Sequence, residues 1–435
     1  MDSKEEAEGE AGAEITHLAT VITQSTGMLS QLLAKHGLRM PSFDKNSNDS
    51  ISDTITPELS EIARAKNMAI NACMELLDLL QGPLTCMLPL YNGSALQAIS
   101  RYKIYSHVPL SGSISYESLS AKCGIHIFEL KQIIRFAIVF HRLFLEKEKG
   151  VVEHSAGSRI LAENRIVQAG IGQFDEFYGS FARCVDAIDQ FDGHEPNETG
   201  FSLSHDTSSN LFSYLYVHPE RAKQFSEAMK FYTGPIPAYS PDFLINGYPW
   251  EDLPQGCVIV DVGGSDGHIG RLIAKKNPGL KVVVQDLPNV VEEAIAMAEA
   301  GAGVGADETA RIHYHAHDFF TPQSITANIY LFRWVLHDWP DEYVVQILRQ
   351  LLPVMRSGAR VIVNESLCPE SGSLPINVER YTRYMDMMML AINKSRLRDE
   401  DEWRGLFAQV DGGFEVRCWT PEGAALAIIE ATWRE

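Results

Sequence analysis

The chain has 435 residues, which exceeds one ordinary hydrophobic core and predicts two domains. Its 37 basic and 57 acidic residues give a net charge of −20, which argues against a surface for nucleic-acid phosphates or anionic lipids and favours a small-molecule ligand. The seven cysteines are scattered without a CxxC pair, so we expect neither a disulfide framework nor a metal site.

The first residues are not expected to form a secretory signal. Residues 1–14 are acidic and lack the apolar core of a secretory signal, and no apolar run reaches the roughly 18 residues of a membrane span. We therefore expect a cytoplasmic protein without membrane or nucleic-acid partners. Residues 1–14 and the polar stretch Pro41–Thr54 are typical of disorder or loop, so residues 1–55 are predicted to be a lead-in and linker.

Two amphipathic helices are predicted next. Apolar residues recur at helical spacing over Ile15–His36 and Pro57–Leu80, and leucines concentrate at the end of the second segment. One copy of the chain cannot cover these apolar faces, so we expect a homodimer.

Residues 116–161 have the pattern of a winged helix: a short helix, a turn at Gly124, a longer amphipathic helix and a wing turning near Gly150. Such modules often bind DNA, but Ser115–Leu161 holds seven Lys or Arg against five Glu and lies in an acidic chain. A dimerisation module is the favoured interpretation. We predict a helical and winged-helix dimerisation domain at 56–165 and a helical connection at 166–250.

From about Gly256 the pattern changes to strands alternating with helices. β-Branched runs separated by helices predict a parallel, doubly wound Rossmann-like sheet over residues 251–435, with ligands outside the carboxyl ends of its strands. The fold class is therefore α/β, with an all-α and winged-helix N-terminal domain. Strands are predicted at 257–262, 281–286, 310–318, 328–338 and 359–366, and helices near 268–277, 289–300 and 341–352.

Polar groups follow the first three predicted strands. In DVGGSDG (Asp261–Gly267), Gly263 and Gly264 allow the backbone to approach a ligand, although Ser265 breaks the GxGxxG pattern. Asp286 ends the second strand, where its carboxylate suits ribose hydroxyls. Asp318 and Phe319 end the third, where a carboxylate and a ring suit an adenine.

The ligand predicted by these strand ends is an adenosine derivative. NAD enzymes hold a pyrophosphate at the helix N-terminus, whereas this loop carries an acid, Asp266, at that point. A negative charge repels pyrophosphate but suits a zwitterionic amino acid with a sulfonium, so S-adenosylmethionine is favoured over NAD.

The stretch RWVLHDWPDE (Arg333–Glu342) places His337 and Asp338 at the end of the fourth predicted strand. Glu365 ends the fifth strand and is positioned to accept the N–H of one imidazole nitrogen, leaving the other to take a proton. A single histidine is often structural, but this position favours a general base. Farther on, methionines in Glu379–Ile392 suit either core packing or an adaptable wall for a flat substrate, namely Met385, Met388 and Met389.

Taken together, these motifs resemble the plant- and fungal-type small-molecule O-methyltransferases, which depend on S-adenosylmethionine. The resemblance extends from about residue 60 to the C-terminus, and two of its segments look like the fungal branch in secondary metabolism. It implies that His337 is the base with Glu365 and Asp338 beside it, and that the substrate is an aromatic or polyketide-derived small molecule. The motifs are EPNETGF (Glu195–Phe201), NGYPW (Asn246–Trp250), DVGGSDG, VQDLP (Val284–Pro288), HDFF (His317–Phe320), RWVLHDWPDE and VIVNES. The cofactor-binding residues implied are Asp261, Gly263, Gly264, Asp286, Leu287, Asp318, Phe319 and Arg333.

One position departs from the family pattern. The segment SRLRDEDEW (Ser395–Trp403) has Leu397 where the family usually has a second glutamate beside the histidine, with Asp399 or Glu400 as substitutes. Some fungal relatives are pericyclases that bind S-adenosylmethionine without consuming it. Pericyclase activity is therefore the alternative function. A non-catalytic DNA-binding regulator is the third, disfavoured by the acidic charge.

Overall fold

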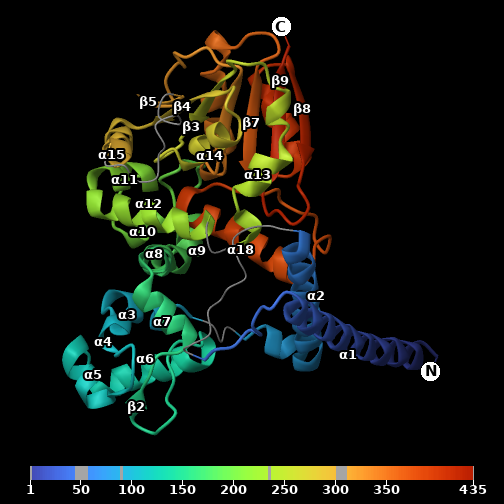
Figure 1. The fold of residues 1–435 in the computed structure, drawn as a ribbon, viewed down its shortest axis with the longest axis vertical. Helices are drawn as coiled ribbons and strands as arrows, with labels where there is room; N and C mark the ends of the chain where they lie inside the picture. The colour runs from blue at the N-terminus through green and yellow to red at the C-terminus, as the bar shows by residue number, and fades with distance from the viewer. Residues whose placement is uncertain (1, 45–56, 89–91, 234–236, 300–310, 435) are drawn as a thin grey trace. The chain divides into compact units, whose positions relative to one another are not determined.

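A computed structural model describes residues 2–44, 57–88, 92–233, 237–299 and 311–434 (Figure 1). The chain divides into two compact units, and each is described by itself. The first comprises residues 1–178, 220–235 and 370–381, and the second comprises residues 179–219, 236–369 and 382–435. The domain limits at 165 and 250 stay predictions.

The first unit is helical, apart from two short strands. Its elements are α1 (Asp2–Lys35), α2 (Pro57–Cys86), α3 (Ser94–Arg101), α4 (Ile104–His107), β1 (Ile114–Ser115), α5 (Tyr116–Cys123), α6 (Ile127–Phe140), β2 (Val151–Val152), α7 (Ala156–Glu163), most of α8 (Arg165–Ala182), and α12 (Pro219–Thr233).

The predicted winged helix is confirmed. The side chain of Ser115 caps α5 by accepting the N–H of Ser118, and Gly124 ends that helix at a positive φ of 70°. The wing turns at Gly150 and its strand β2 pairs with β1, a strand before α5 that the pattern does not predict.

The N-terminal helices differ from the prediction at both ends. The acidic start, expected to be disordered, belongs to α1, which begins at Asp2, because its Ala and Glu residues are strong helix formers. Helix α2 continues past Leu80 through a kink at Gly82, where φ is 71° and Pro83 follows. Of the predicted polar linker, residues 45–54 lie outside the described residues.

The second unit contains the predicted sheet. Its helical elements are α9 (Cys184–Gln190), α10 (Gly200–Ser204), α11 (Leu211–Val217), η1 (Pro237–Tyr239), α13 (Asp242–Gly247), η2 (Trp250–Asp252), α14 (His268–Lys276), α15 (Pro288–Glu299), η3 (Leu336–Asp338), α17 (Asp341–Arg349), η4 (Leu352–Val354), the greater part of α18 (Ile376–Asn393), and α19 (Glu400–Val410). Its strands are β3 (Val258–Val262), β4 (Lys281–Asp286), β5 (Ile312–Ala316), β6 (Ile329–Arg333), β7 (Arg360–Glu365), β8 (Phe414–Trp419) and β9 (Ala427–Trp433).

Within the described residues the sheet has seven strands in the order β5-β4-β3-β6-β7-β9-β8. Strands β3 to β7 pair in parallel, as predicted, and the antiparallel pair β8 and β9 is an addition that the sequence analysis did not predict. The order reverses at β3, which lies between β4 and β6. Ligands of doubly wound sheets bind at this switch point, outside the carboxyl ends of the strands.

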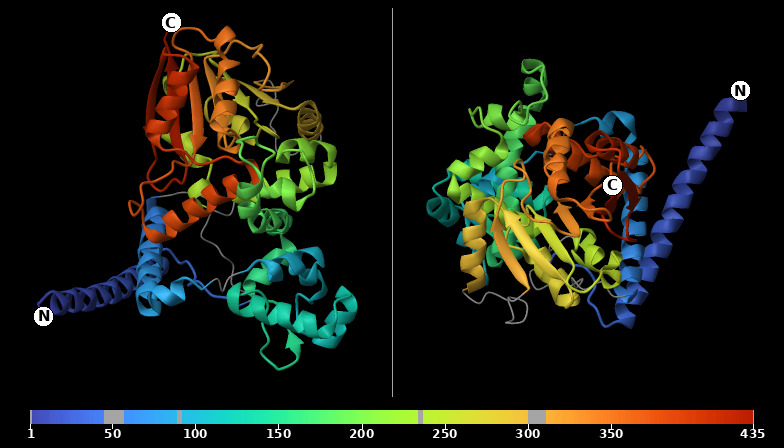
Figure 2. Two further views of the ribbon diagram at one scale, coloured as in Figure 1. Left: turned by 180° about the vertical axis from the view of Figure 1, so that it is seen from behind. Right: turned by 90° about the horizontal axis from the view of Figure 1, so that it is seen from above.

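Both faces of the sheet are covered. Val260 of β3 packs in a core with α17 and α19, whereas its neighbour Ile259 packs in a second core with α13 and α14. Figure 1 shows the face with α13 and α14, and the left view of Figure 2 shows the opposite face. Burial on both sides explains why the central strands are continuous runs of apolar residues. Among the described residues, no helix combines the length and apolarity needed to span a bilayer.

Candidate active site

The glycine-rich loop follows β3 and bends because of its backbone conformations. Gly263 and Gly267 have φ values of 71° and 78°, and Ser265, at the position that breaks the glycine pattern, also adopts a positive φ of 52°. A Cβ on Gly264 would lie 2.8 Å from the carboxyl of Asp261, so the loop lies directly over that side chain. The bend of the loop therefore carries no bulky side chain, which would let a ligand approach its backbone as predicted.

Asp286 joins the second strand to this loop. Its Oδ2 accepts the N–H of Ser265 at 2.9 Å and its Oδ1 accepts the N–H of Leu287 at 2.8 Å. Each oxygen keeps a second lone pair for a ligand hydroxyl. Burial raises the pKa of Asp286, and the two backbone N–H groups oppose that rise.

Asp261 lies beneath the loop. Its side chain is buried and its Oδ2 has no hydrogen-bond partner among the described residues. Burial, followed by the charge of Asp286, raises the pKa of Asp261 to about 7. Arg333, at the end of β6, is also buried and donates to the side chain of Asn364 and to the carbonyl of Tyr239 at 2.8 Å. The charge of Asp261 partly opposes the lowering of the pKa of Arg333 by burial, so the two side chains lie near each other.

Asp318 and Phe319 lie just past β5, which ends at Ala316. The ring of Phe319 is half-buried and packs edge-on against Trp339, with 6.0 Å between ring centroids. Sequence reasoning missed the pair that anchors this loop: Gln285 and Gln323 are buried and exchange two hydrogen bonds of 3.0 and 2.8 Å. The available signal was a glutamine that directly follows a run of valines and precedes Asp286. An amide at the end of a buried strand needs hydrogen-bond partners.

The strand that carries RWVLHDWPDE is shorter than predicted. β6 ends at Arg333, and Trp334 adopts a positive φ of 53° that turns the chain into η3. His337 and Asp338 therefore lie in a 3₁₀ turn rather than on the strand. The turn packs against the glycine loop, since a Cβ on Gly263 would lie 2.8 Å from Cγ2 of Val335.

His337 is buried, with 7% of its surface exposed. Its Nε2 lies 3.7 Å from Oδ1 of Asp338, which is too long for a hydrogen bond. Burial, and then the positive charge of Arg398, lowers the pKa of His337 to about 3. The imidazole is therefore neutral near pH 7, as a general base requires.

Glu365 has a different partner from the one predicted. Its Oε1 accepts the backbone N–H groups of Val335, Leu336 and His337 at 3.2, 2.7 and 3.1 Å, so it holds the amide side of the turn instead of an imidazole N–H. The reason is geometric, because the first N–H groups of a helical turn have no partner within it. Burial raises the pKa of Glu365 to about 7, while Arg398 and the three N–H groups oppose the rise.

Asp338 is held from α18. Its Oδ1 accepts the side-chain N–H of Asn393 at 2.8 Å, and burial together with the neighbouring Glu365 raises the pKa of Asp338 well above its usual value. Asn393 was not predicted from the sequence. Met389 precedes it by four residues and lies on the same helix face, where Met388 and Met389 are buried and Met385 is half-buried.

The departure at Leu397 is not compensated by the acids that follow it. Leu397 is buried, and its backbone N–H donates to Asp386 at 2.7 Å. Asp399 caps α19, and Glu400 accepts from Arg404 one turn along the same helix. Both acids therefore have the helix-start roles that their positions suggest.

The titration of His337 has a consequence for stability. A histidine with a folded pKa near 3 and an unfolded pKa near 6.5 contributes stability that is complete above about pH 6.5 and is lost as pH falls. Between pH 7 and pH 5 the wild-type free energy of unfolding is expected to fall by about 2 kcal/mol more than that of His337→Gln. Urea denaturation of both proteins at each pH measures this; equal losses would contradict the low pKa.

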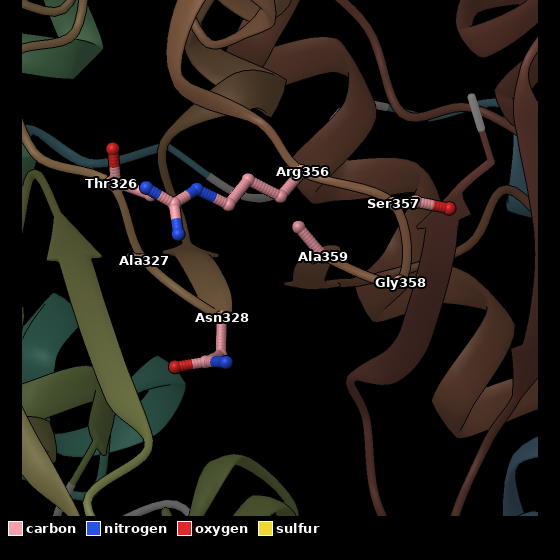
Figure 3. A pocket seen from close by; sticks show the side chains of 7 residues that line it. All are labelled: Thr326, Ala327, Asn328, Arg356, Ser357, Gly358 and Ala359. Carbon is pink, nitrogen blue, oxygen red and sulfur yellow. The ribbon is translucent and has the colours of Figure 1, made fainter.

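A surface hollow of about 250 Å³ lies elsewhere on the second unit (Figure 3). Thr326, Asn328 and Arg356 are among its lining residues, and they precede β6 and β7. It therefore opens at the amino ends of these strands, at the edge opposite His337.

Comparison with known proteins decides the family. The sequence model of the O-methyltransferase domain family matches residues 186–415 of this chain. The chain belongs to the O-methyltransferase family. This O-methyltransferase is 39% identical to the grayanic acid biosynthesis cluster O-methyltransferase of Cladonia grayi, over 97% of this chain and 88% of that protein. It is 38% identical to O-methyltransferase pyvH of Aspergillus violaceofuscus, over 97% and 99% of the two chains.

Solved structures share the fold of this O-methyltransferase. OxaC in complex with SAH and oxaline superimposes with a TM-score of 0.71 at 20% identity, covering 96% of this chain and 100% of that one. A structure described as a pericyclic reaction enzyme gives 0.66 at 20% identity with the same coverage. The protein is an S-adenosylmethionine-dependent O-methyltransferase of a family that acts in fungal secondary metabolism.

Proposed function

We propose that this O-methyltransferase methylates a hydroxyl group of a fungal secondary metabolite, an aromatic or polyketide-derived small molecule, with His337 as general base. The observation that carries the proposal is a buried, neutral imidazole in a turn packed against the glycine-rich loop. A base held beside a cofactor loop is what methylation of a weakly acidic hydroxyl requires.

The residues present suit S-adenosylmethionine. Asp286 has lone pairs left for ribose hydroxyls, and Gly263 and Gly264 keep the loop free of side chains. Asp266 accepts the N–H of His268 at the start of α14, where a negative charge disfavours a pyrophosphate. Bound at this loop, the cofactor supplies the methyl group. Asp261, Leu287, Asp318, Phe319 and Arg333 are proposed to complete or support its site.

The task of His337 is to take the proton of the acceptor hydroxyl. A phenol has a pKa of about 10, far above that of this imidazole, so the proton moves only as the oxygen forms its new bond. The position of His337 therefore matters more than its basicity. Asp338, 3.7 Å from the imidazole, is proposed to help orient it, and Glu365 to hold the turn.

The methionines of α18 are proposed to line the substrate. Asn393 ends this helix and bonds Asp338, so the face that carries Met389 leads to the catalytic turn. Flexible thioethers adapt to flat apolar molecules. Met385 and Met388 are assigned to the same wall.

A second candidate, a pericyclase that binds but does not consume S-adenosylmethionine, is favoured by Leu397. It needs His337 or Arg333 to donate a hydrogen bond or charge to a substrate carbonyl. The guanidinium of Arg333 already donates to Asn364 and Tyr239, and His337 has a low pKa. The occupied guanidinium and the uncharged imidazole disfavour the pericyclase and favour methyl transfer.

The proposal extends to assembly and location. Helix α2 exposes Leu77, Leu79, Leu80 and Leu84, which supports the expected homodimer. The cytoplasm is the proposed location, from the sequence alone. Sedimentation velocity at micromolar concentration tests the dimer.

Mass spectrometry tests the reaction. The enzyme is incubated with S-adenosylmethionine carrying a deuterated methyl group and with a panel of phenols, chlorophenol among them, and of polyketide-derived pyridones. We expect a product heavier by one labelled methyl group, formed in step with the demethylated cofactor. An isomerised product of unchanged mass with intact cofactor would establish the pericyclase instead.

A further inference from the structure

The turn that carries His337 is conformationally strained. Trp334 adopts a φ of 53°, a left-handed conformation that is unfavourable for a non-glycine residue. Such a conformation persists only where the surrounding structure holds it. The contacts that hold this turn therefore decide where the imidazole lies.

The amide side of the turn is held by Glu365, and its carbonyl side is held by the segment 395–398. Oγ of Ser395 lies 2.6 Å from the carbonyl oxygen of His337 and 2.9 Å from that of Trp339. Ser395 is buried, so its hydroxyl has these carbonyls as acceptors in place of bulk water.

Arg398 holds the same side. Its guanidinium donates from Nη1 to the carbonyl of Leu336 at 3.2 Å, from Nη2 to the carbonyl of Trp339 at 2.7 Å and from Nε to Oδ1 of Asp341 at 2.8 Å. Its side chain is completely buried. A planar fork fixed at three points restrains the turn more rigidly than a single ammonium group would.

We propose that Ser395 and Arg398 are positioning residues for His337: they hold the carbonyl side of its turn while Glu365 holds the amide side. The proposal rests on the proposed role of His337 as base. It also gives the segment around Leu397 a function without a carboxylate at that position, since the contacts on either side of Leu397 set the imidazole's place.

The charges around His337 give a second readout. Asp338 on its own turn, Glu365 from β7 and Arg398 from the segment before α19 face this part of the site. Arg398 disfavours the imidazolium and thereby lowers the pKa of His337. Loss of the guanidinium charge therefore favours protonation beyond any effect that a change of burial has on its own.

The test compares Ser395→Ala, Arg398→Lys and Arg398→Met with the control Arg396→Met. Arg396 is a matched control, because it also pairs with Asp341, at 2.8 Å, yet is half-exposed and has no contact with the turn among those described. Turnover is followed with the phenol that the wild-type methylates best in the panel. Amide hydrogen exchange of residues 333–342 is followed without any acceptor.

We expect the first three variants to lower kcat by about 10–100-fold with the KM for S-adenosylmethionine changed by less than about 3-fold. Their turn amides exchange at least about 10-fold faster, while the control matches wild type. Arg398→Met moves the acid limb of the rate profile to higher pH, and does so by more than Arg398→Lys or Ser395→Ala. If Arg398→Met does not fold, the kcat and the amide exchange of Arg398→Lys and Ser395→Ala still test the positioning role.

Wild-type exchange and kcat in these variants would overturn the positioning proposal while leaving the base intact. Failure of the base itself is seen separately, as undiminished turnover by His337→Gln.

Discussion

Replacing His337 by glutamine is expected to lower the rate of methyl transfer by about 10²–10⁴-fold, with little change in S-adenosylmethionine binding. Glutamine keeps hydrogen-bonding capacity and similar bulk but cannot take a proton near neutral pH. The residue is 7% exposed and lies on a turn fixed from both sides, so water cannot easily replace the lost base. Single-turnover assays measure the chemical step, and calorimetry measures cofactor binding.

The control for this variant is His313→Gln. His313 is on β5 in the same unit but is exposed, so its substitution should leave both the rate and the binding near wild type. A His337→Gln enzyme that retains more than about a tenth of the wild-type rate would refute the general-base assignment. Weakened cofactor binding with an unchanged chemical rate would instead assign His337 to the cofactor site.

Replacing Glu365 by alanine is expected to lower the free energy of unfolding by about 3–5 kcal/mol. The substitution removes the common acceptor of three buried N–H groups and a charge opposite Arg398, whose side chain is fully buried. Glu365→Gln keeps an acceptor oxygen and should lose less, about 1–2 kcal/mol. The difference in stability between the two variants separates the contribution of the hydrogen bonds from that of the charge.

Chemical denaturation at pH 7 measures both variants beside Glu415→Ala. Glu415 is on β8, where it is half-exposed and pairs with Arg434, so its loss should cost less than about 1 kcal/mol. A Glu365→Ala protein as stable as this control would show that the amide side of the turn does not depend on the carboxylate.

Much of the second unit was predictable because its strands are buried on both faces. Residues 257–262 and 281–286 are runs of β-branched residues that match β3 and β4 within one residue. β8 and β9 were not predicted. Along β8, exposed and half-buried residues alternate at the sheet edge, so its apolar signal is weak.

The candidate site divides in the same way. Asp286 and the glycine loop lie together as predicted, because parallel strands bring their carboxyl ends to one edge. The partner of Glu365 could not be predicted. Which N–H groups it accepts depends on the left-handed Trp334, a conformation that sequence periodicity does not report.

By itself the sequence determined the α/β class, the strand end that carries Asp286, and the family, since each depends on local pattern or short motifs. Only the tertiary structure decided how His337 is held. Glu365, Asn393, Ser395 and Arg398 come from separate elements, and their meeting at one turn depends on packing over long chain separations. Local preferences cannot specify such contacts, because burial and hydrogen-bond satisfaction are properties of the whole fold.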